Sequence, residues 1–342
     1  MKQRIDDECS QIEVAGIRDF DPLAIVILTG SAYPALAQGV AELLRIKCFE
    51  PVSRFPDGEI QVAIAPNLRK REVFIVQPTG PPKQADAILE VLLLIDAARR
   101  ASAEEITVVQ PFASYQRADR KDKPRVPITA ALLPQLLVHA GADRLITVDN
   151  HSAQQQGYIK EPWDELYASY SLVPAIRELG FSSGVLLSPD AGGTKRADYY
   201  AHILTASSLA FIYKRRRRSD NSSIAVELVG DVVGKDVLIV DDIIASGSTV
   251  FHAAELAAKC GARRIFVAVA HGLFLGDFLK KLDSSPIEKV LVTNSLPHPI
   301  EITQHPKIQV VPIEPLLSEA IRRTYTGESL NEALFPKFDA TI

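Results

Sequence analysis

One stretch of the sequence, Val237 to Thr249, combines the residue types best suited to chemistry. Its apolar run ends in two adjacent carboxylates, Asp241 and Asp242, and a loop of small residues follows: Ala245, Ser246, Gly247, Ser248 and Thr249. Backbone N–H groups of such a loop, with a helix amino terminus behind them, suit a phosphate dianion. Carboxylates repel phosphate but accept hydrogen bonds from vicinal sugar hydroxyls. The stretch therefore predicts a site for a ribose that carries a phosphate.

A plainer alternative exists for this loop, in which Ser246 or Ser248 only caps the following helix. Two adjacent acids at the end of an apolar strand favour the ligand site over that alternative.

A second candidate is the tight turn in Arg54–Glu59. Gly58 permits the turn, Phe55 could cover the face of an aromatic base, and Asp57 and Glu59 could accept hydrogen bonds from an amino group or a ribose. An ordinary Pro–Asp–Gly turn without a ligand is the alternative.

Two basic segments could bind or cover phosphates. Residues 115–129 hold five cationic and two acidic side chains, and the run from Lys214 to Arg218 holds five cations in succession. Charge alone allows a solvated loop, a nucleic-acid contact or a loop that closes over a triphosphate. The net charge of −4 does not favour a nucleic-acid surface over the whole molecule. We therefore expect anions to bind at local clusters.

Two further segments end apolar runs with potential metal ligands. His151 stands three residues after Val148, the end of one apolar run, and Asp190 precedes a Gly-rich turn and the start of a helix. A single His at a strand end is more often structural. Magnesium prefers oxygen ligands, so an ion here would be held mainly by phosphates, waters and a carboxylate.

The elements expected to position these residues are alternating strands and helices. Short β-branched runs alternate with helical patterns in both halves, which predicts βα units around parallel sheets. A strand at 72–77, a helix and a strand at 106–109 match the same elements at 236–241 and 265–268, offset by 164 residues. The match predicts two copies of one α/β domain, with chance similarity among βα units as the alternative.

Length and composition narrow the class of protein. We expect an N-terminal extension at 1–21, domains at 22–163 and 164–325, and a C-terminal tail at 326–342. No apolar run approaches the roughly 20 residues of a membrane-spanning helix, and the amino terminus lacks the pattern of a secretory signal. Three widely spaced cysteines, Cys9, Cys48 and Cys260, indicate neither a disulfide framework nor a zinc site. We expect a cytoplasmic protein.

The stretch around Asp241 and Asp242 resembles the type I phosphoribosyltransferase signature. With the other segments described above, the resemblance is to ribose-phosphate pyrophosphokinases and spans roughly residues 23–323. It implies two tandem type I phosphoribosyltransferase-like domains, each a mostly parallel sheet flanked by helices.

The resemblance also implies roles for single residues. It assigns ATP contacts to Arg117, Ala118 and Asp119 and, in the neighbouring subunit's site, to Phe55, Asp57, Gly58 and Glu59. It assigns magnesium binding to His151 and Asp190 and catalysis to Lys214 and Arg216, of which Arg216 also contacts the sugar phosphate. It assigns ribose 5-phosphate binding to Asp241, Asp242, Ala245, Ser246, Gly247, Ser248 and Thr249. The sequence departs from the family at Ala118, where Gln is usual, and at Ala245, where many members carry Asp.

The implied activity is transfer of pyrophosphate from Mg-ATP to the C1 hydroxyl of ribose 5-phosphate, which gives 5-phosphoribosyl 1-pyrophosphate and AMP. The implied assembly is a homo-oligomer, a hexamer built from dimers, without nucleic-acid or membrane partners. The alternatives are a non-catalytic paralogue that regulates an active subunit and a phosphoribosyltransferase that acts on a base.

Overall fold

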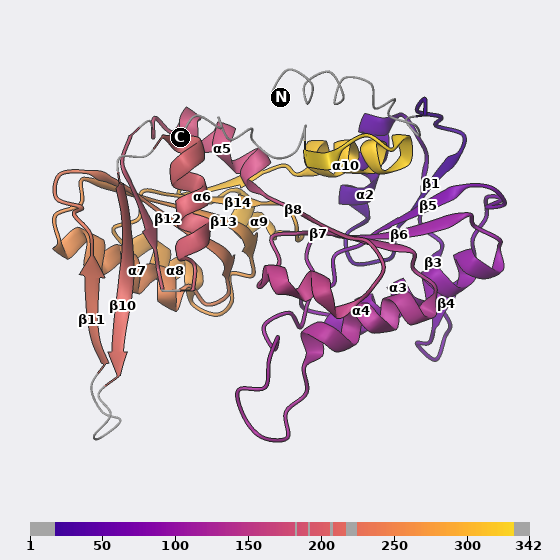
Figure 1. Ribbon diagram of the computed structural model, residues 1–342, viewed down its shortest axis with the longest axis horizontal. Coiled ribbons are helices and arrows are strands. Elements are labelled where there is room, and N and C mark those ends of the chain that lie inside the picture. The colour runs from indigo at the N-terminus through magenta and orange to yellow at the C-terminus, as the bar shows by residue number, and fades with distance from the viewer. Residues whose placement is uncertain (1–17, 182, 191, 206–207, 217–223, 332–342) are drawn as a thin grey trace, which may run out of the picture.

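The computed structural model describes residues 18–181, 183–190, 192–205, 208–216 and 224–331, apart from the side chains of 214–216 and 224–226. They form two sheets side by side, each covered by helices (Figure 1). In spatial order the first sheet contains β2 (Cys48–Phe49), β1 (Ile25–Leu28), β5 (Glu72–Val76), β6 (Glu105–Gln110), β7 (Arg144–Val148) and β8 (Trp163–Leu166), all parallel.

The second sheet has the same design with an added edge strand. Its spatial order is β11 (Ile224–Val229), β10 (Ser208–Arg216), β9 (Val185–Ser188), β12 (Asp236–Ile244), β13 (Arg264–Gly272), β14 (Lys289–Thr293) and β15 (Ile308–Val311). Neighbouring strands in this sheet are parallel, except that β10 and β11 are antiparallel. From β10 to β15 this order repeats the order of the first sheet from β2 to β8, which confirms the predicted tandem α/β fold.

The helices pack on both faces of the sheets. They are α2 (Pro34–Leu44), α3 (Gln84–Arg100), α4 (Thr129–Ala140), α5 (Ser169–Glu178), α6 (Thr194–Leu204), α7 (Ser248–Lys259), α8 (Phe278–Ser284), α9 (Ile300–Thr303) and α10 (Glu314–Thr326), with a 3₁₀ turn η1 (Ala153–Tyr158). On the first sheet, Val73 and Ile75 face α3, whereas Phe74 and Val76 face the core shared with α2 and α10. Both faces are buried, which explains why the strands read as continuous apolar runs.

One core joins the two sheets. It contains Phe74 of β5 and Leu238 of β12, together with residues of α2, α5 and α10. The last helix, α10, packs against α2 and thus returns the chain to the first sheet (Figure 1). The boundary expected between residues 163 and 164 falls at the start of β8, which pairs with β7. The division into domains stays a prediction.

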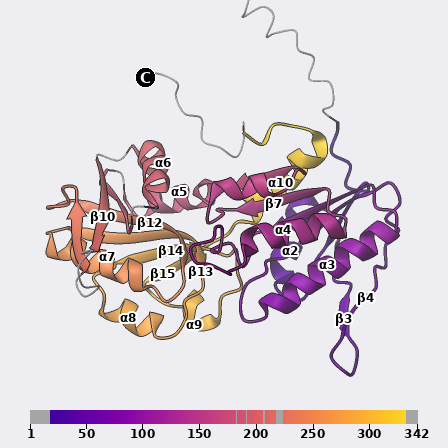
Figure 2. The ribbon, with the colours of Figure 1, turned by 60° about the horizontal axis from the view of Figure 1, so that its bottom comes forward.

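A small antiparallel hairpin, β3 (Val52–Arg54) and β4 (Ile60–Val62), stands apart from both sheets. Figure 2 shows it projecting from the side of the molecule near α3. Among the described residues, no helix is long and apolar enough to cross a membrane.

Candidate active site

A cavity of about 1310 Å³ lies where loops of the two sheets face each other. The loops after β6, β7 and β9, the start of α6 and the strand β12 all contribute to its wall. Among the residues expected at a site, the cavity brings together Arg117, Ala118, Asp119, His151, Asp190, Asp241 and Asp242. The carboxyl ends of parallel strands are where α/β proteins bind ligands, and both sheets point such ends at one cavity.

Asp242 and His151 meet across the cavity from the two sheets. His151 Nδ1 lies 2.8 Å from Asp242 Oδ2. Burial disfavours the Asp242 carboxylate, but the hydrogen bond with His151 and the charge of Arg196 outweigh it and hold the pKa of Asp242 below its usual range. The same hydrogen bond raises the pKa of His151. The contact is therefore an ion pair between the halves when the imidazole is protonated.

The pKa values of the two neighbouring acids are shifted in opposite directions. Burial and the negative charge of Asp242 raise the pKa of Asp241. Two adjacent carboxylates cannot ionise independently, so one proton is retained to higher pH than usual. Both acids lie within β12, which continues to Ile244 beyond the strand end that the apolar run suggests.

The loop after β12 has a conformation fixed by Gly247. This glycine has φ +77°, and a Cβ atom there would lie 2.6 Å from Phe251 and 2.8 Å from Phe278. Helix α7 begins at Ser248 with Gly247 as its capping residue, so neither serine holds the capping position. The alternative in which Ser246 or Ser248 caps the helix is therefore not what the structure shows. Residues 245–249 begin three residues after Asp242 and do not line the cavity.

Asp190 lies at the amino-terminal side of α6, in a turn that it stabilises itself. Its Oδ1 accepts hydrogen bonds from the backbone N–H groups of Gly192, at 2.9 Å, and Gly193, at 3.0 Å. The described residues contain no cluster of three or more His, Cys, Asp or Glu side chains arranged to hold a metal. His151, Asp190 and the acidic pair nevertheless line one cavity, a donor set that fits a magnesium ion held mainly by substrate phosphates.

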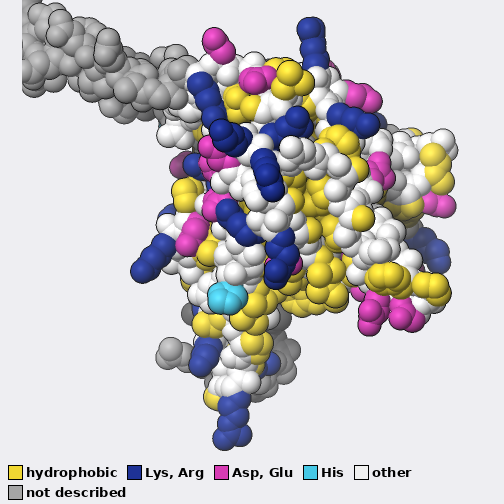
Figure 3. Space-filling view, turned by 90° about the vertical axis from the view of Figure 1, so that its right-hand side faces the viewer, with side chains coloured by type: hydrophobic (Ala, Val, Ile, Leu, Met, Phe, Trp, Pro, Cys, Tyr) yellow, Lys and Arg dark blue, Asp and Glu magenta, His cyan; other side chains and the backbone are white. Residues whose placement is uncertain are grey.

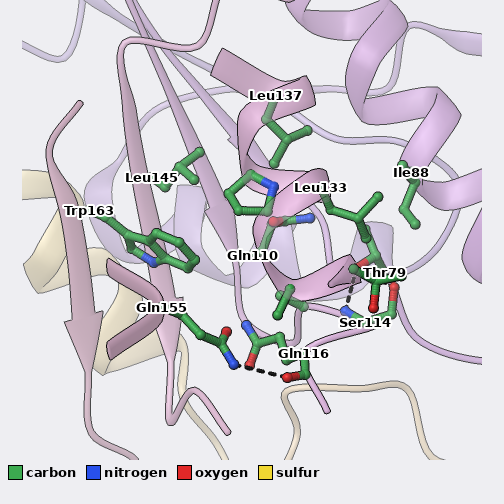
Figure 4. Close-up of a pocket in the computed structure, with 14 residues that line it drawn as sticks. Thr79, Ile88, Gln110, Ser114, Gln116, Leu133, Leu137, Leu145, Gln155 and Trp163 are labelled. Carbon is green, nitrogen blue, oxygen red and sulfur yellow. Dashed lines mark hydrogen bonds between the residues drawn. The ribbon is translucent and has the colours of Figure 1, made fainter. Parts of the chain in front are cut away.

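The loop that carries Arg117 is joined to the His151 segment by two glutamines. Gln116 accepts a hydrogen bond from the backbone N–H of His151 at 3.0 Å and donates to Asn150 at 2.8 Å. Gln155 donates to the backbone carbonyl of Gln116 at 2.9 Å, as Figure 4 shows. A second cavity of about 410 Å³ lies beside this loop, and Arg117 and His151 line both cavities.

The hairpin residues Phe55, Asp57, Gly58 and Glu59 do not line either of these cavities of their own chain. Gly58 has φ +96°, and the backbone N–H of Glu59 donates to Asp57 Oδ1 at 3.1 Å, so the expected tight turn is present. Phe55, in the same turn, is 44% exposed to solvent.

The backbone of Lys214 and Arg216 forms the end of β10, where these residues pair with Val226 and Ile224 of β11. Their side chains, and the whole of Arg217 and Arg218, lie outside what the structure describes. Their expected catalytic role therefore stays a prediction.

Two charged residues of the cavity to which the sequence had given no role, Glu165 and Arg196, are placed next to the expected site residues. Arg196 Nη1 lies 3.8 Å from Asp241 Oδ1 and 3.6 Å from Asp242 Oδ1. Burial, and next the charge of Asp149, raise the pKa of Glu165 to about 7. The signals in the sequence were the acid Glu165 in β8 and the cation Arg196 three residues after Gly193, but only the fold reveals that they converge.

Two parallel sheets in tandem, one carrying an acidic pair followed by a glycine-fixed loop, define a phosphoribosyltransferase-like α/β protein. Residues 25–141 match the family model described as the N-terminal domain of ribose phosphate pyrophosphokinase, and residues 218–335 match the phosphoribosyl synthetase-associated domain. The chain belongs to the ribose-phosphate pyrophosphokinase family.

Proteins of this family match almost the full length of the chain. Ribose-phosphate pyrophosphokinase A of Dictyostelium discoideum is 41% identical over 90% of this chain and 96% of its own. A ribose-phosphate pyrophosphokinase of Chlorobaculum tepidum is 40% identical over 90% of this chain and 94% of its own. The crystal structure of phosphoribosylpyrophosphate synthetase from Mycobacterium smegmatis matches with a TM-score of 0.82 and 33% identity over 89% of this chain and 99% of its own. These relatives favour the catalytic interpretation over a regulatory paralogue or a base-specific transferase.

Proposed function

We propose that this protein transfers the pyrophosphoryl group of ATP to the C1 hydroxyl of ribose 5-phosphate. The observation that carries the proposal is the contact of 2.8 Å between His151 and Asp242, because it brings the expected nucleotide side and the expected sugar side together in one cavity. A bond forms between the C1 oxygen and the β-phosphorus, the bond from that phosphorus to the α-phosphate oxygen breaks, and AMP leaves as the hydroxyl proton is lost.

The cavity suits a reaction that needs positioning and charge neutralisation rather than a covalent intermediate. Asp241 and Asp242 bind the sugar hydroxyls, and the loop Ala245–Thr249 binds the 5-phosphate. Arg117, Ala118 and Asp119 contact ATP. Lys214 and Arg216 stabilise the charge on the phosphoryl oxygens in the transition state, and Arg216 also contacts the sugar phosphate.

Magnesium, when bound with ATP, would neutralise phosphate charge and polarise the transferred group. His151 and Asp190 would hold it, and the acidic lining of the cavity is consistent with a cation. Removal of divalent cations should therefore abolish turnover.

The position of the hairpin supports assembly into an oligomer. Phe55, Asp57, Gly58 and Glu59 are exposed and away from the cavities of their own chain, so they are free to complete the ATP site of a second copy. Apolar side chains are also exposed on α3 and α4: Leu89, Leu132 and Leu136. Figure 3 shows apolar side chains on this end of the molecule among scattered charged ones. A homo-oligomer, a hexamer built from dimers, is the assembly that we propose.

We expect no nucleic-acid partner, because the net charge of −4 does not favour a nucleic-acid surface over the whole molecule. The protein works in the cytoplasm, without a membrane partner.

The proposal is tested by following AMP. We expect AMP to form only when ATP, ribose 5-phosphate and magnesium are all present. Turnover of 5-phosphoribosyl 1-pyrophosphate with a free base, without AMP formation from ATP, would instead identify a base-specific transferase.

A further inference from the structure

His271 at the end of β13 is a buried side chain that bridges the two halves of the molecule. It is 4% exposed. Its Nε2 lies 3.0 Å from the carbonyl oxygen of Val148, the last residue of β7 in the first sheet. Its Nδ1 lies 2.8 Å from the hydroxyl of Ser295, which follows β14 in the second sheet. One imidazole therefore fixes the end of a first-sheet strand to two strands of the second sheet.

The chemistry of the partners defines the tautomer of His271. A carbonyl oxygen only accepts hydrogen bonds, so Nε2 must carry a proton and donate to Val148. Burial lowers the pKa of His271, which favours the neutral ring and leaves Nδ1 without a proton. The hydroxyl of Ser295 then donates to Nδ1, in preference to the longer contact of 3.3 Å with the carbonyl of Ala270.

The surroundings of His271 connect it to the cavity. Phe112 packs edge-on against the ring with centroids 5.0 Å apart. Val148 directly precedes Asp149 and leads into His151, whereas Ile243, the neighbour of Asp242, pairs with His271 in the sheet. The end of β7 is therefore joined to the second sheet twice, to β13 by His271 with Val148 and to β12 by His151 with Asp242.

We propose that His271 is a positioning residue that holds the end of β7 at a fixed distance from Asp242 through its hydrogen bond to Val148. The inference rests on the proposed function, which places His151 on the Mg-ATP side and Asp242 on the sugar side. Loss of the bond would leave each side intact but allow the two sides to shift. A shift of about 1 Å between reacting groups can cost about 10²-fold in rate.

Two substitutions separate this role from simple packing. The amide nitrogen of glutamine reaches about as far from the backbone as Nε2 of histidine, whereas asparagine reaches only to the position of Nδ1. His271→Gln should keep the hydrogen bond to Val148 and retain kcat within about threefold, whereas His271→Asn should lower kcat by about 10- to 100-fold. His271→Asn should also raise the magnesium concentration needed for half-maximal rate, with the KM for ribose 5-phosphate unchanged.

The result that overturns the proposal is an equal loss, or no loss, in the two variants. Thermal denaturation and sedimentation of both variants identify unfolding. If His271→Asn unfolds, Ser295→Ala replaces it, because loss of the hydroxyl frees the tautomer and should lower kcat several-fold, whereas wild-type kcat would contradict the role.

A measurement that does not depend on activity completes the test. The chain has seven histidines, so ¹⁵N-labelling of histidine allows the tautomer of His271 to be assigned by comparison with His271→Gln. A neutral ring protonated at Nε2 is expected, and a charged ring or an Nδ1 proton would overturn the assignment. Absence of AMP formation by the wild type would refute the proposed function, whereas an active wild type with indistinguishable Gln and Asn variants would refute only the positioning role.

Discussion

At the scale of single residues, sugar binding and charge stabilisation are assigned to different side chains. Asp242 lies in contact with His151 and Arg196, and its carboxylate is held ionised by both. Lys214 lies at the end of β10, on a different strand from Asp242. If Asp242 binds the sugar in the ground state and Lys214 acts on charge that develops in the transition state, substitutions of the two residues must differ in their kinetic effects.

The first prediction is this difference. Asp242→Asn should raise the KM for ribose 5-phosphate by about 10- to 100-fold, the range expected for lost hydrogen bonds to a charged group. Lys214→Ala should lower kcat by about 10²–10³ and leave that KM within about twofold. Steady-state kinetics with either substrate varied measures both. Asp231→Asn, which breaks only an exposed ion pair with Lys235, is the control and should behave as the wild type. Unchanged turnover in folded Lys214→Ala would remove the catalytic role of this residue.

At the scale of single elements, the junction of β7 and β8 contains a carboxyl group with a shifted pKa. Glu165 of β8 accepts hydrogen bonds from the backbone N–H of Asn150 and from Gln156, at 3.0 and 2.8 Å. Its pKa is raised to about 7 from an ordinary value of 4.5, so the folded state holds the proton more tightly than the unfolded chain does. The resulting stabilisation is fully present below about pH 4.5 and is lost as the pH rises through about 7.

The second prediction follows from that sign. Between pH 5 and 8 the wild type should lose up to about 3 kcal/mol of stability relative to Glu165→Gln, which cannot ionise. Urea denaturation at several pH values measures the difference. Glu42→Gln on the exposed side of α2 should follow the wild-type curve. Parallel pH dependences of the wild type and Glu165→Gln would show that the Glu165 proton does not contribute.

The third prediction concerns the turn between β12 and α7. Gly247→Ala should destabilise the protein by about 2–4 kcal/mol and raise the KM for ribose 5-phosphate, because the left-handed backbone and the contact with Phe251 both oppose a Cβ atom. Gly276→Ala is the matched control, since its φ is +63° but nothing lies within 4 Å of the added atom. It should cost only about 1–2 kcal/mol. Equal effects of the two substitutions on KM would contradict a role of the loop in phosphate binding.

The sequence predicted helices and strands better than contacts between distant residues. The expected strand at 72–77 is β5 (Glu72–Val76), because apolar, β-branched runs buried on two faces have few other conformations. The meeting of His151 with Asp242, 91 residues apart, has no signal in the local pattern. Family resemblance selected both residues, but only the packing of the two sheets reveals that they form a pair. Arg196 and Glu165 were missed because their places in the cavity also depend on that packing.

For the whole molecule, the fourth prediction is that each ATP site is shared between two copies. Phe55→Ala removes an aromatic side chain of the donated hairpin, and Lys214→Ala removes the proposed catalytic lysine of the receiving chain. Each homo-oligomer should be nearly inactive, but mixed and reassembled oligomers should recover about one quarter of wild-type activity, because one site in four combines an intact Lys214 with an intact hairpin. Activity of the mixture after dissociation and reassembly measures this. No recovery in verified mixed oligomers would place the hairpin and Lys214 of one chain in the same site.

The central claim is that two phosphates move together from ATP to the sugar. Its most direct test supplies ATP labelled separately at the β-phosphorus and in the adenosine, with ribose 5-phosphate and magnesium. The account predicts that the β-label appears in the sugar product while the adenosine label appears in AMP, in equal amounts. Formation of ADP, with the β-label remaining on the nucleotide, would show transfer of a single phosphate and contradict the account.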